Sequence, residues 1–180
     1  MKWILYIIIA FALLASCSST KQLTLPPDRT MDHLDFHINI DTIIFQDKRK
    51  DVSAQTDINL DNKEAGEHVP ILTDSHKEAI KETIYTNTIY QEEEAFKVIV
   101  ELMEAKKIFS ATPEVEREEV IIKIKLRANS TMRGMWTEAE GTHYVSSDNA
   151  KNDHFEELYL RSLKNVTHMC LEMMKSNKER

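Results

Sequence analysis

The last part of the chain carries its strongest pattern, an apolar stripe that recurs every three or four residues from Phe155 to Met174. This spacing places the residues on one side of an α-helix. They are Phe155, Leu158, Tyr159, Ser162, Leu163, Val166, Met169, Cys170, Met173 and Met174. A long helix with one apolar face must bury that face against another element, so the rest of the chain has to supply a matching surface.

The segment 33–47 alternates apolar and polar residues, which is typical of a strand with one buried face. Its apolar residues fall at even positions as far as Ile40 and at odd positions from Ile43 onward. A second strand or one extra residue would change the phase in this way. We favour one long strand, bent by a bulge after Asp41.

Three later segments are also predicted as strands. The segment 119–127 alternates most regularly. The segment 95–103 fits both a helix and a strand, and its β-branched residues at 98–100 favour the strand. A further strand is expected within 132–145, with Gly134 and Gly141 marking its limits. The region of Pro113 should connect the strands at 95–103 and 119–127.

A first helix is predicted from Asp74 to Thr88, because Ser75 and Glu78 match the capping box that satisfies free amides at a helix start. Strands with a single apolar face need helices on that face alone. The expected fold class is therefore α+β, an antiparallel sheet of three to four strands with two helices packed on one face.

The expected domain spans residues 31–180 and includes a long polar loop at 47–68. A loop of this length indicates function, disorder or a missed element, and DINL at 57–60 is a candidate short strand. Residues 17–30 are polar, and Pro26 and Pro27 exclude a helix there. This segment is predicted to be a flexible tether.

Residues 1–16 have the pattern of a secretory signal peptide. Lys2 precedes about a dozen apolar residues, whereas a membrane-spanning helix needs roughly 20. The sequence Leu14-Ala15-Ser16-Cys17 resembles the lipobox of bacterial lipoproteins, in which the cysteine thiol is acylated and the chain is cut before it. The resemblance implies a lipidated N-terminus at Cys17. An ordinary signal peptide that happens to contain a cysteine is the alternative.

The residue after this cysteine bears on location. In lipoproteins of enteric-type bacteria an Asp at that position favours the inner membrane, and here it is Ser18. The resemblance therefore implies attachment to the outer membrane through at least two acyl chains. The domain would lie in the periplasm or be exposed at the cell surface.

Composition excludes several function classes. The net charge of -7 removes the electrostatic basis for nucleic-acid binding. With three glycines, a phosphate-binding loop or a nucleophile elbow cannot be built in its usual form. If Cys17 carries lipid, Cys170 is left without a disulfide partner, and we expect it to be a buried, inert thiol. We expect no cofactor and no enzymatic activity.

One metal site can be suggested. His33, Asp35 and His37 lie two residues apart, so a regular strand would place all three side chains on one face, where imidazole and carboxylate groups could approach one ion. A solvated polar face would show the same pattern, and we favour that interpretation. Similarly, Met169, Met173 and Met174 are expected in the core, with binding of an amphiphile or a partner helix as the alternative.

The stretch IIFQDKR at 43–49 is similar to the strand followed by Asp-x-Arg in YajG-type lipoproteins, with Asp47 and Arg49 as the matching residues. In its order of elements the chain also resembles LPS-assembly lipoproteins. The resemblance implies a non-enzymatic envelope protein whose partner is another envelope protein or an amphiphilic ligand. A ligand- or metal-binding envelope lipoprotein is the alternative.

Overall fold

The positions of the helices and strands come from a computed structural model. It describes residues 32–50, 52, 65–92, 94–130, 132, 134, 136–148 and 152–178. The strands are β1 (Phe36–His37), β2 (Asn39–Asp47), β3 (Gly66–His68), β4 (Thr88–Ile89), β5 (Ala95–Ala111), β6 (Glu116–Ser130) and β7 (Trp136–Asp148). The helices are α2 (Asp74–Thr86) and α3 (Asn152–Lys178). The predicted signal peptide 1–16, the whole tether 17–30 including Cys17, and the segment 57–60 lie outside the described residues.

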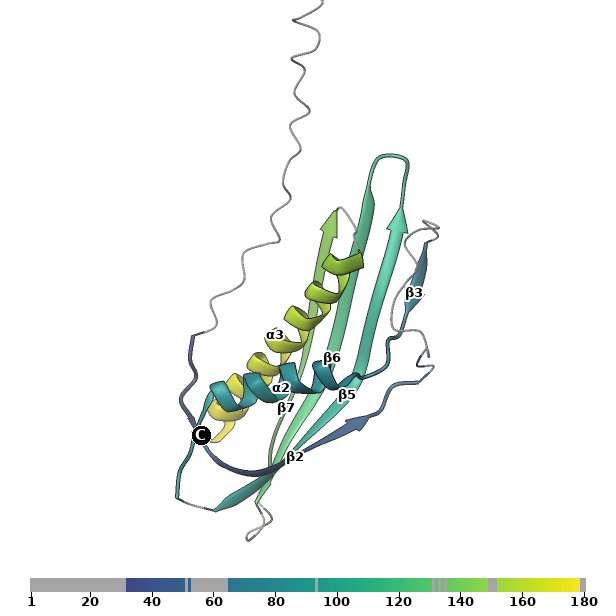
Figure 1. The fold of residues 1–180 in the computed structure, drawn as a ribbon. Helices are drawn as coiled ribbons and strands as arrows, with labels where there is room; N and C mark the ends of the chain where they lie inside the picture. The colour runs from purple at the N-terminus through teal and green to yellow at the C-terminus, as the bar shows by residue number, and fades with distance from the viewer. Residues whose placement is uncertain are drawn as a thin grey trace, which may run out of the picture.

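The main sheet has five strands in the order β2-β5-β6-β7, with β3 pairing β5 beyond the end of β2 (Figure 1). Strands β5, β6 and β7 are antiparallel, as predicted. Strand β2, however, pairs with β5 in parallel, so the prediction of an antiparallel sheet of three to four strands is wrong in both the pairing and the number of strands. The reason is that α2 lies between these strands in the chain, and a crossover through a helix is the connection that parallel strands require.

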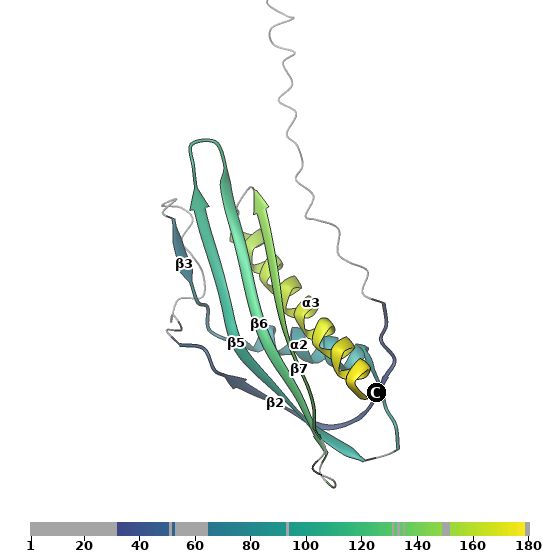
Figure 2. The same ribbon diagram turned by 180° about the vertical axis from the view of Figure 1, so that it is seen from behind.

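Both helices lie on one face of the sheet, as predicted, and the opposite face is not covered by them (Figures 1 and 2). On β6 the inward positions alternate strictly and are fully buried from Val120 to Ala128. They pack against Leu158, Leu163 and Val166 of α3 within one core. Each such side chain contributes about 1.5–3 kcal/mol when it leaves water, so the two layers depend on each other.

The change of phase in the first alternating segment is a β-bulge. The register between β2 and β5 shifts between Ile40 and Thr42, and Ile43 and Phe45 then pack against the core. The predicted long strand is nevertheless divided, because Ile38 separates β2 from the short β1, which pairs with β4 in a second sheet.

Helix α2 begins at Asp74, as predicted, but its capping box is formed by other residues than Ser75 and Glu78. Thr73 is the N-cap, its side chain accepts a hydrogen bond from the His76 amide, and the His76 ring accepts one from the Thr73 amide. Ser75 contacts only the Thr73 hydroxyl, at 2.8 Å. The sequence pattern missed this box because it expects Glu or Gln where His76 stands.

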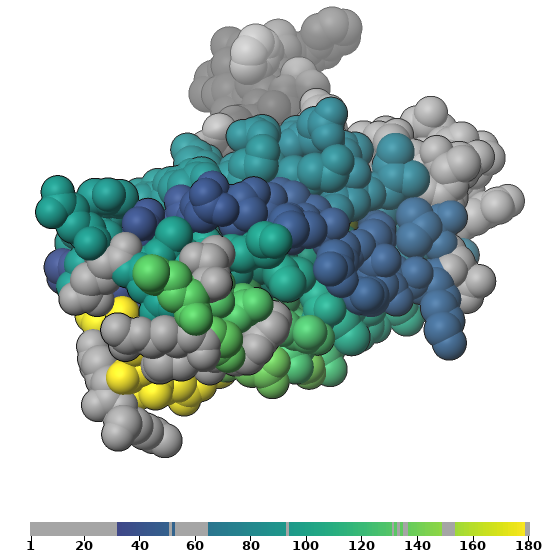
Figure 3. Space-filling model, turned by 90° about the horizontal axis from the view of Figure 1, so that it is seen from below, coloured from purple at the N-terminus to yellow at the C-terminus, as the bar shows by residue number. Residues whose placement is uncertain are grey.

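Residues 32–38, which we call the strap, are held by the end of α3. The His168 ring contacts the Asp32 carbonyl at 2.9 Å, and Lys175 and Lys178 donate to the carbonyls of Leu34 and His37 at 2.7 and 2.9 Å. Seen from below, the purple strap leads into blue β2 across the molecule, and the yellow end of α3 lies beside one end of this path (Figure 3). The described N-terminal segment and the end of α3 are thereby joined.

The two glycines expected at the limits of the last strand have different roles. Gly134 has a φ of 62° in the turn before β7, which is the left-handed conformation that glycine adopts without strain. Gly141 lies in the middle of β7, so the prediction that it ends the strand is wrong. A Cβ at Gly141 would lie 3.0 Å from the Cys170 sulfur and 3.4 Å from Val166, because α3 approaches the backbone closely there.

We expect Gly141→Ala to destabilise the domain by about 1–3 kcal/mol, because the added methyl overpacks the contact with α3. The free energy of unfolding in urea would measure this cost. Cys170→Ala should recover part of it in the double variant, since the sulfur is the nearest atom. Gly66→Ala, where no atom lies within 4 Å, is the matched control. Equal losses at both glycines would contradict the close approach.

Candidate functional site

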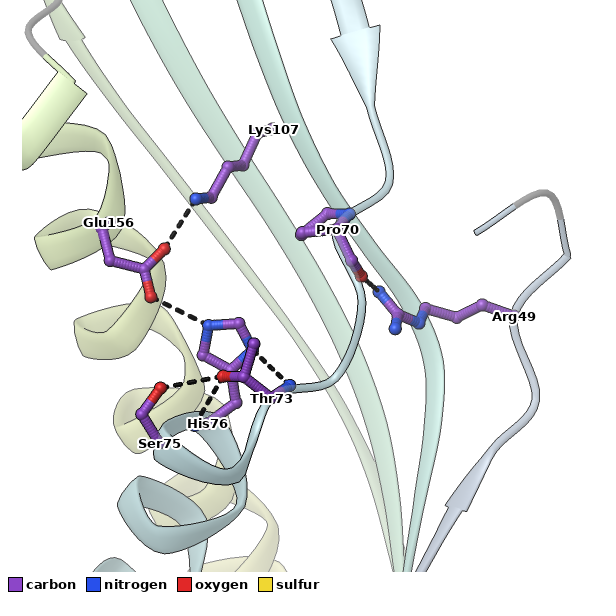
Figure 4. Close-up of polar contacts among 7 residues, drawn as sticks. All are labelled: Arg49, Pro70, Thr73, Ser75, His76, Lys107 and Glu156. Atoms are coloured by element: carbon purple, nitrogen blue, oxygen red, sulfur yellow. Dashed lines mark hydrogen bonds and ion pairs between the residues drawn. The ribbon is translucent and has the colours of Figure 1, made fainter. Parts of the chain in front are cut away.

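The candidate site is built around a fully buried lysine. Lys107 occupies an inward position of β5, and its side chain is 0% exposed. An ammonium group in such a place is costly unless it is paired. Its Nζ lies 2.7 Å from Glu156 Oε2 (Figure 4). It also faces the rings of Phe155 and Tyr159 at 5.6 and 5.2 Å. The first turns of α3 therefore supply both the counter-ion and the aromatic surroundings.

His76 holds the other oxygen of the same carboxylate. Its Nε2 lies 2.9 Å from Glu156 Oε1, while its Nδ1 accepts the Thr73 amide. This network assigns the ring proton to Nε2, which donates to Glu156. The hydrogen bond from His76 is the main cause that lowers the pKa of Glu156 to about 2, with Lys107 adding to it against the effect of burial. Glu156 is therefore an anion that joins α2, α3 and β5 (Figure 4).

Asp47 and Arg49, the two residues of the Asp-x-Arg resemblance, form a fork at the end of β2. Arg49 Nε and Nη2 donate to the two oxygens of Asp47 at 2.9 and 2.7 Å, and Nη1 donates to the Pro70 carbonyl at 2.6 Å. The hydrogen bond from Arg49 also lowers the pKa of Asp47. The Arg49 side chain is 2% exposed, and its hydrogen bond to Pro70 fixes the end of β2 to the segment that enters α2 (Figure 4).

A second buried pair joins α3 to the sheet. Glu118 of β6 is fully buried and contacts the ring of His154 in the first turn of α3. Burial also raises the pKa of the nearby Tyr159 phenol, partly offset by Arg49, so that group stays neutral. At neutral pH Glu156 has no proton to give, since an effective general acid has a pKa near the working pH. The arrangement links the helix layer to the sheet.

A groove of about 590 Å³ runs between the outer sides of α2 and α3. Ala79 and Leu160 supply its apolar part. Ion pairs bridge or border it, at 2.8 Å between Lys164 and Glu82 and 3.2 Å between Arg161 and Glu157. The groove is therefore polar at its rim, and Lys107, His76 and the half-buried Glu156 do not line it.

The structure brings together two of the three suggested metal ligands. His33 Nδ1 lies 2.7 Å from Asp35 Oδ1, and both side chains are exposed. Asp35 has a φ of 45°, so the backbone there is left-handed and the regular alternation that would have aligned His37 is lost. Among the described residues, no group of three or more His, Cys, Asp or Glu is placed to hold a metal ion.

The remaining sequence candidates lie along α3. Cys170 is fully buried, and burial raises the pKa of its thiol to about 12, which removes the thiolate that reactions would need. Met174 is buried in the core, whereas Met169 and Met173 are only partly buried. The core prediction is therefore confirmed for Met174, and Met173 packs against the same core.

Sequence reasoning missed Lys107, His76, Glu118 and His154. A signal existed for Lys107, because it follows Ala105 and precedes Phe109 in the inward register of an alternating strand. No signal identified its partner, since Glu156 lies 49 residues away in the chain.

Comparisons with known proteins add little to this picture. No family model matches the chain, and no curated protein matches it. Among solved structures, a minor lipoprotein from Acinetobacter baumannii aligns with a TM-score of 0.41 and 9% identity over 76% of this chain and 92% of its own. Protein XCC0632 from Xanthomonas campestris aligns with a TM-score of 0.46 and 10% identity over 82% and 91%. Scores at this level carry no argument about function.

The described part of the chain contains no helix that is long and apolar enough to cross a membrane.

We expect Glu156→Gln to destabilise the domain by about 3 kcal/mol, because it leaves the buried ammonium of Lys107 without a counter-ion. Chemical unfolding measures the loss. Glu157→Gln is the matched control, since that carboxylate is exposed and pairs only along the helix surface with Arg161. Adding Lys107→Met should recover most of the loss, and a double variant no more stable than Glu156→Gln would contradict the pairing.

The same carboxylate predicts a dependence on pH. The pKa of Glu156 falls from 4.5 to about 2 on folding, so its contribution to stability is complete above about pH 5. It is lost as pH falls through 4.5 toward 2. We therefore expect the stability gap between wild type and Glu156→Gln to be constant from pH 5 to 7 and to narrow below pH 4. A gap that stays constant down to pH 2.5 would rule this out.

Proposed function

We propose that this chain is a lipid-anchored bacterial envelope lipoprotein that binds a partner and catalyses no reaction. The lipobox-like sequence ending at Cys17 and the polar tether after it support the anchor. The strap supports a firm attachment to the domain, because three side chains of α3 hold its carbonyls. We expect force on the tether to be transmitted through the strap to α3.

One observation carries the non-enzymatic role. The buried ionisable groups described above pair with one another, Lys107 and His76 with Glu156 and Glu118 with His154. Such pairing stabilises a fixed arrangement and displaces the pKa of Glu156 from the range useful for proton transfer. What the domain offers to other molecules is then its surface.

The proposed membrane and the proposed family likenesses both follow from the sequence. Ser18 in place of an Asp favours the outer membrane, with the domain in the periplasm. The Asp47 and Arg49 pair supports the likeness to YajG-type lipoproteins, because it is a built part of the fold where β2 ends. The order of elements supports the likeness to LPS-assembly lipoproteins. Both likenesses favour an envelope protein or an amphiphile as the partner.

Metabolic labelling with a radioactive fatty acid tests the anchor. We expect label in the wild-type protein and none in Cys17→Ala, which should leave the membrane fraction. Cys170→Ala is the matched control and should keep both label and location, because its thiol is buried. Ser18→Asp should keep the label and shift the protein to the inner-membrane fraction. Absence of label from the wild type would overturn the lipoprotein assignment.

A further inference from the structure

Strand β7 is the last strand of the main sheet in the order β2-β5-β6-β7. It pairs with β6 from Arg117 and Asp148 at one end to Asn129 and Trp136 at the other. Within the described ranges, no strand pairs with its outer edge, and the ribbon views place it at the side of the sheet (Figures 1 and 2). A row of backbone groups on such an edge is a template for another strand.

This edge is interrupted by neither a bulge nor a proline, while Asn177 of α3 donates to the Glu138 carbonyl at 3.4 Å. Its pairing with β6 has no register shift, and the segment 136–148 contains no proline. The opposite edge differs, because β2 is interrupted by the bulge between Ile40 and Thr42. Bulges and prolines are common means of blocking an edge, so β7 is the more receptive side of the sheet.

The side chains of β7 on the open face of the sheet determine which charge an added strand should carry. Glu138 and Glu140 lie next to Lys125 and Lys123 of β6, at 3.0 and 2.7 Å, and their side chains remain 52% and 45% exposed. Charges thus alternate from β6 to β7, and the next strand would continue the alternation with basic residues. Strand β7 itself contains no Lys or Arg, so a second copy of it would not supply them.

On the helix-covered face of the sheet, the side chains of β7 lie against α3. Asn165 contacts the His143 ring of β7 at 3.3 Å, and the Met173 methyl lies 3.6 Å from the position of a Gly141 Cβ. Met169 lies one turn from each along α3, and both methionines are partly exposed. Inward side chains of an added strand would therefore meet methionines, which repack readily around apolar groups.

We propose that the outer edge of β7 binds an extended segment of a partner protein in which basic residues alternate with apolar ones. The segment adds a strand to the sheet: its basic residues pair with Glu138 and Glu140, and its apolar residues cover Met169 and Met173. This proposal rests on the proposed partner-binding role and names the surface and the chemistry of the partner.

The test uses the full chain in detergent and a nine-residue peptide that alternates lysine with valine. We expect micromolar binding and slower hydrogen exchange of β7 amides. Glu140→Lys should weaken binding about tenfold, because it turns attraction into repulsion. Glu104→Lys is the matched control, since Glu104 acts on the same Lys123 from the β5 side of the open face, away from the edge. Met169→Gln tests the apolar side, with the exposed Met103→Gln as its control.

Several results would overturn the proposal. These are no binding by the wild type, equal effects of Glu140→Lys and Glu104→Lys, equal binding of a glutamate-valine peptide, and slower exchange in β2 in place of β7. A dimer of the free chain joined through β7 would also overturn it. Fatty-acid labelling is independent of all these outcomes, so failure at the edge and failure of the lipoprotein assignment can be told apart.

Discussion

The contact between α3 and the inner face of β5, β6 and β7 is the interaction on which the rest of the structure depends. The sheet has one apolar face, and α3 supplies the long apolar stripe that removes it from water. Gly141 allows the helix to approach the backbone at the middle of β7. The end of the same helix also holds the strap, so the core and the described N-terminal segment share one element.

The buried charges at the start of α3 fix how the layers are aligned. Lys107 can be paired only if α3 and α2 bring Glu156 and His76 to the same place. An alternative packing would leave a buried ammonium without a partner, which costs several kcal/mol. We infer that this cluster selects one alignment among those that apolar contact alone would allow. The fork of Asp47 and Arg49 plays a related part at the end of β2.

The two faces of the sheet have separate uses in this picture. The helix-covered face contains the core and the internal ion pairs. The open face carries rows of opposite charges, such as Glu101 with Arg127 at 2.6 Å and Lys123 with Glu140 at 2.7 Å. These rows end at β7 with the acidic residues Glu138 and Glu140, which give the proposed edge site its charge.

Local patterns in the sequence determined the two helices, the alternation of the strands, the choice of strand over helix at 95–103 and the bulge near Asp41, because each depends on neighbours a few residues apart. They also determined that the helices share one face. Only the tertiary structure decided the parallel pairing of β2, the capping by Thr73 and His76, the place of Gly141 and the separation of His37 from His33 and Asp35. The partners of Lys107 and Glu118 were decided there too, because those contacts join residues far apart in the chain, whose meeting depends on how the layers pack.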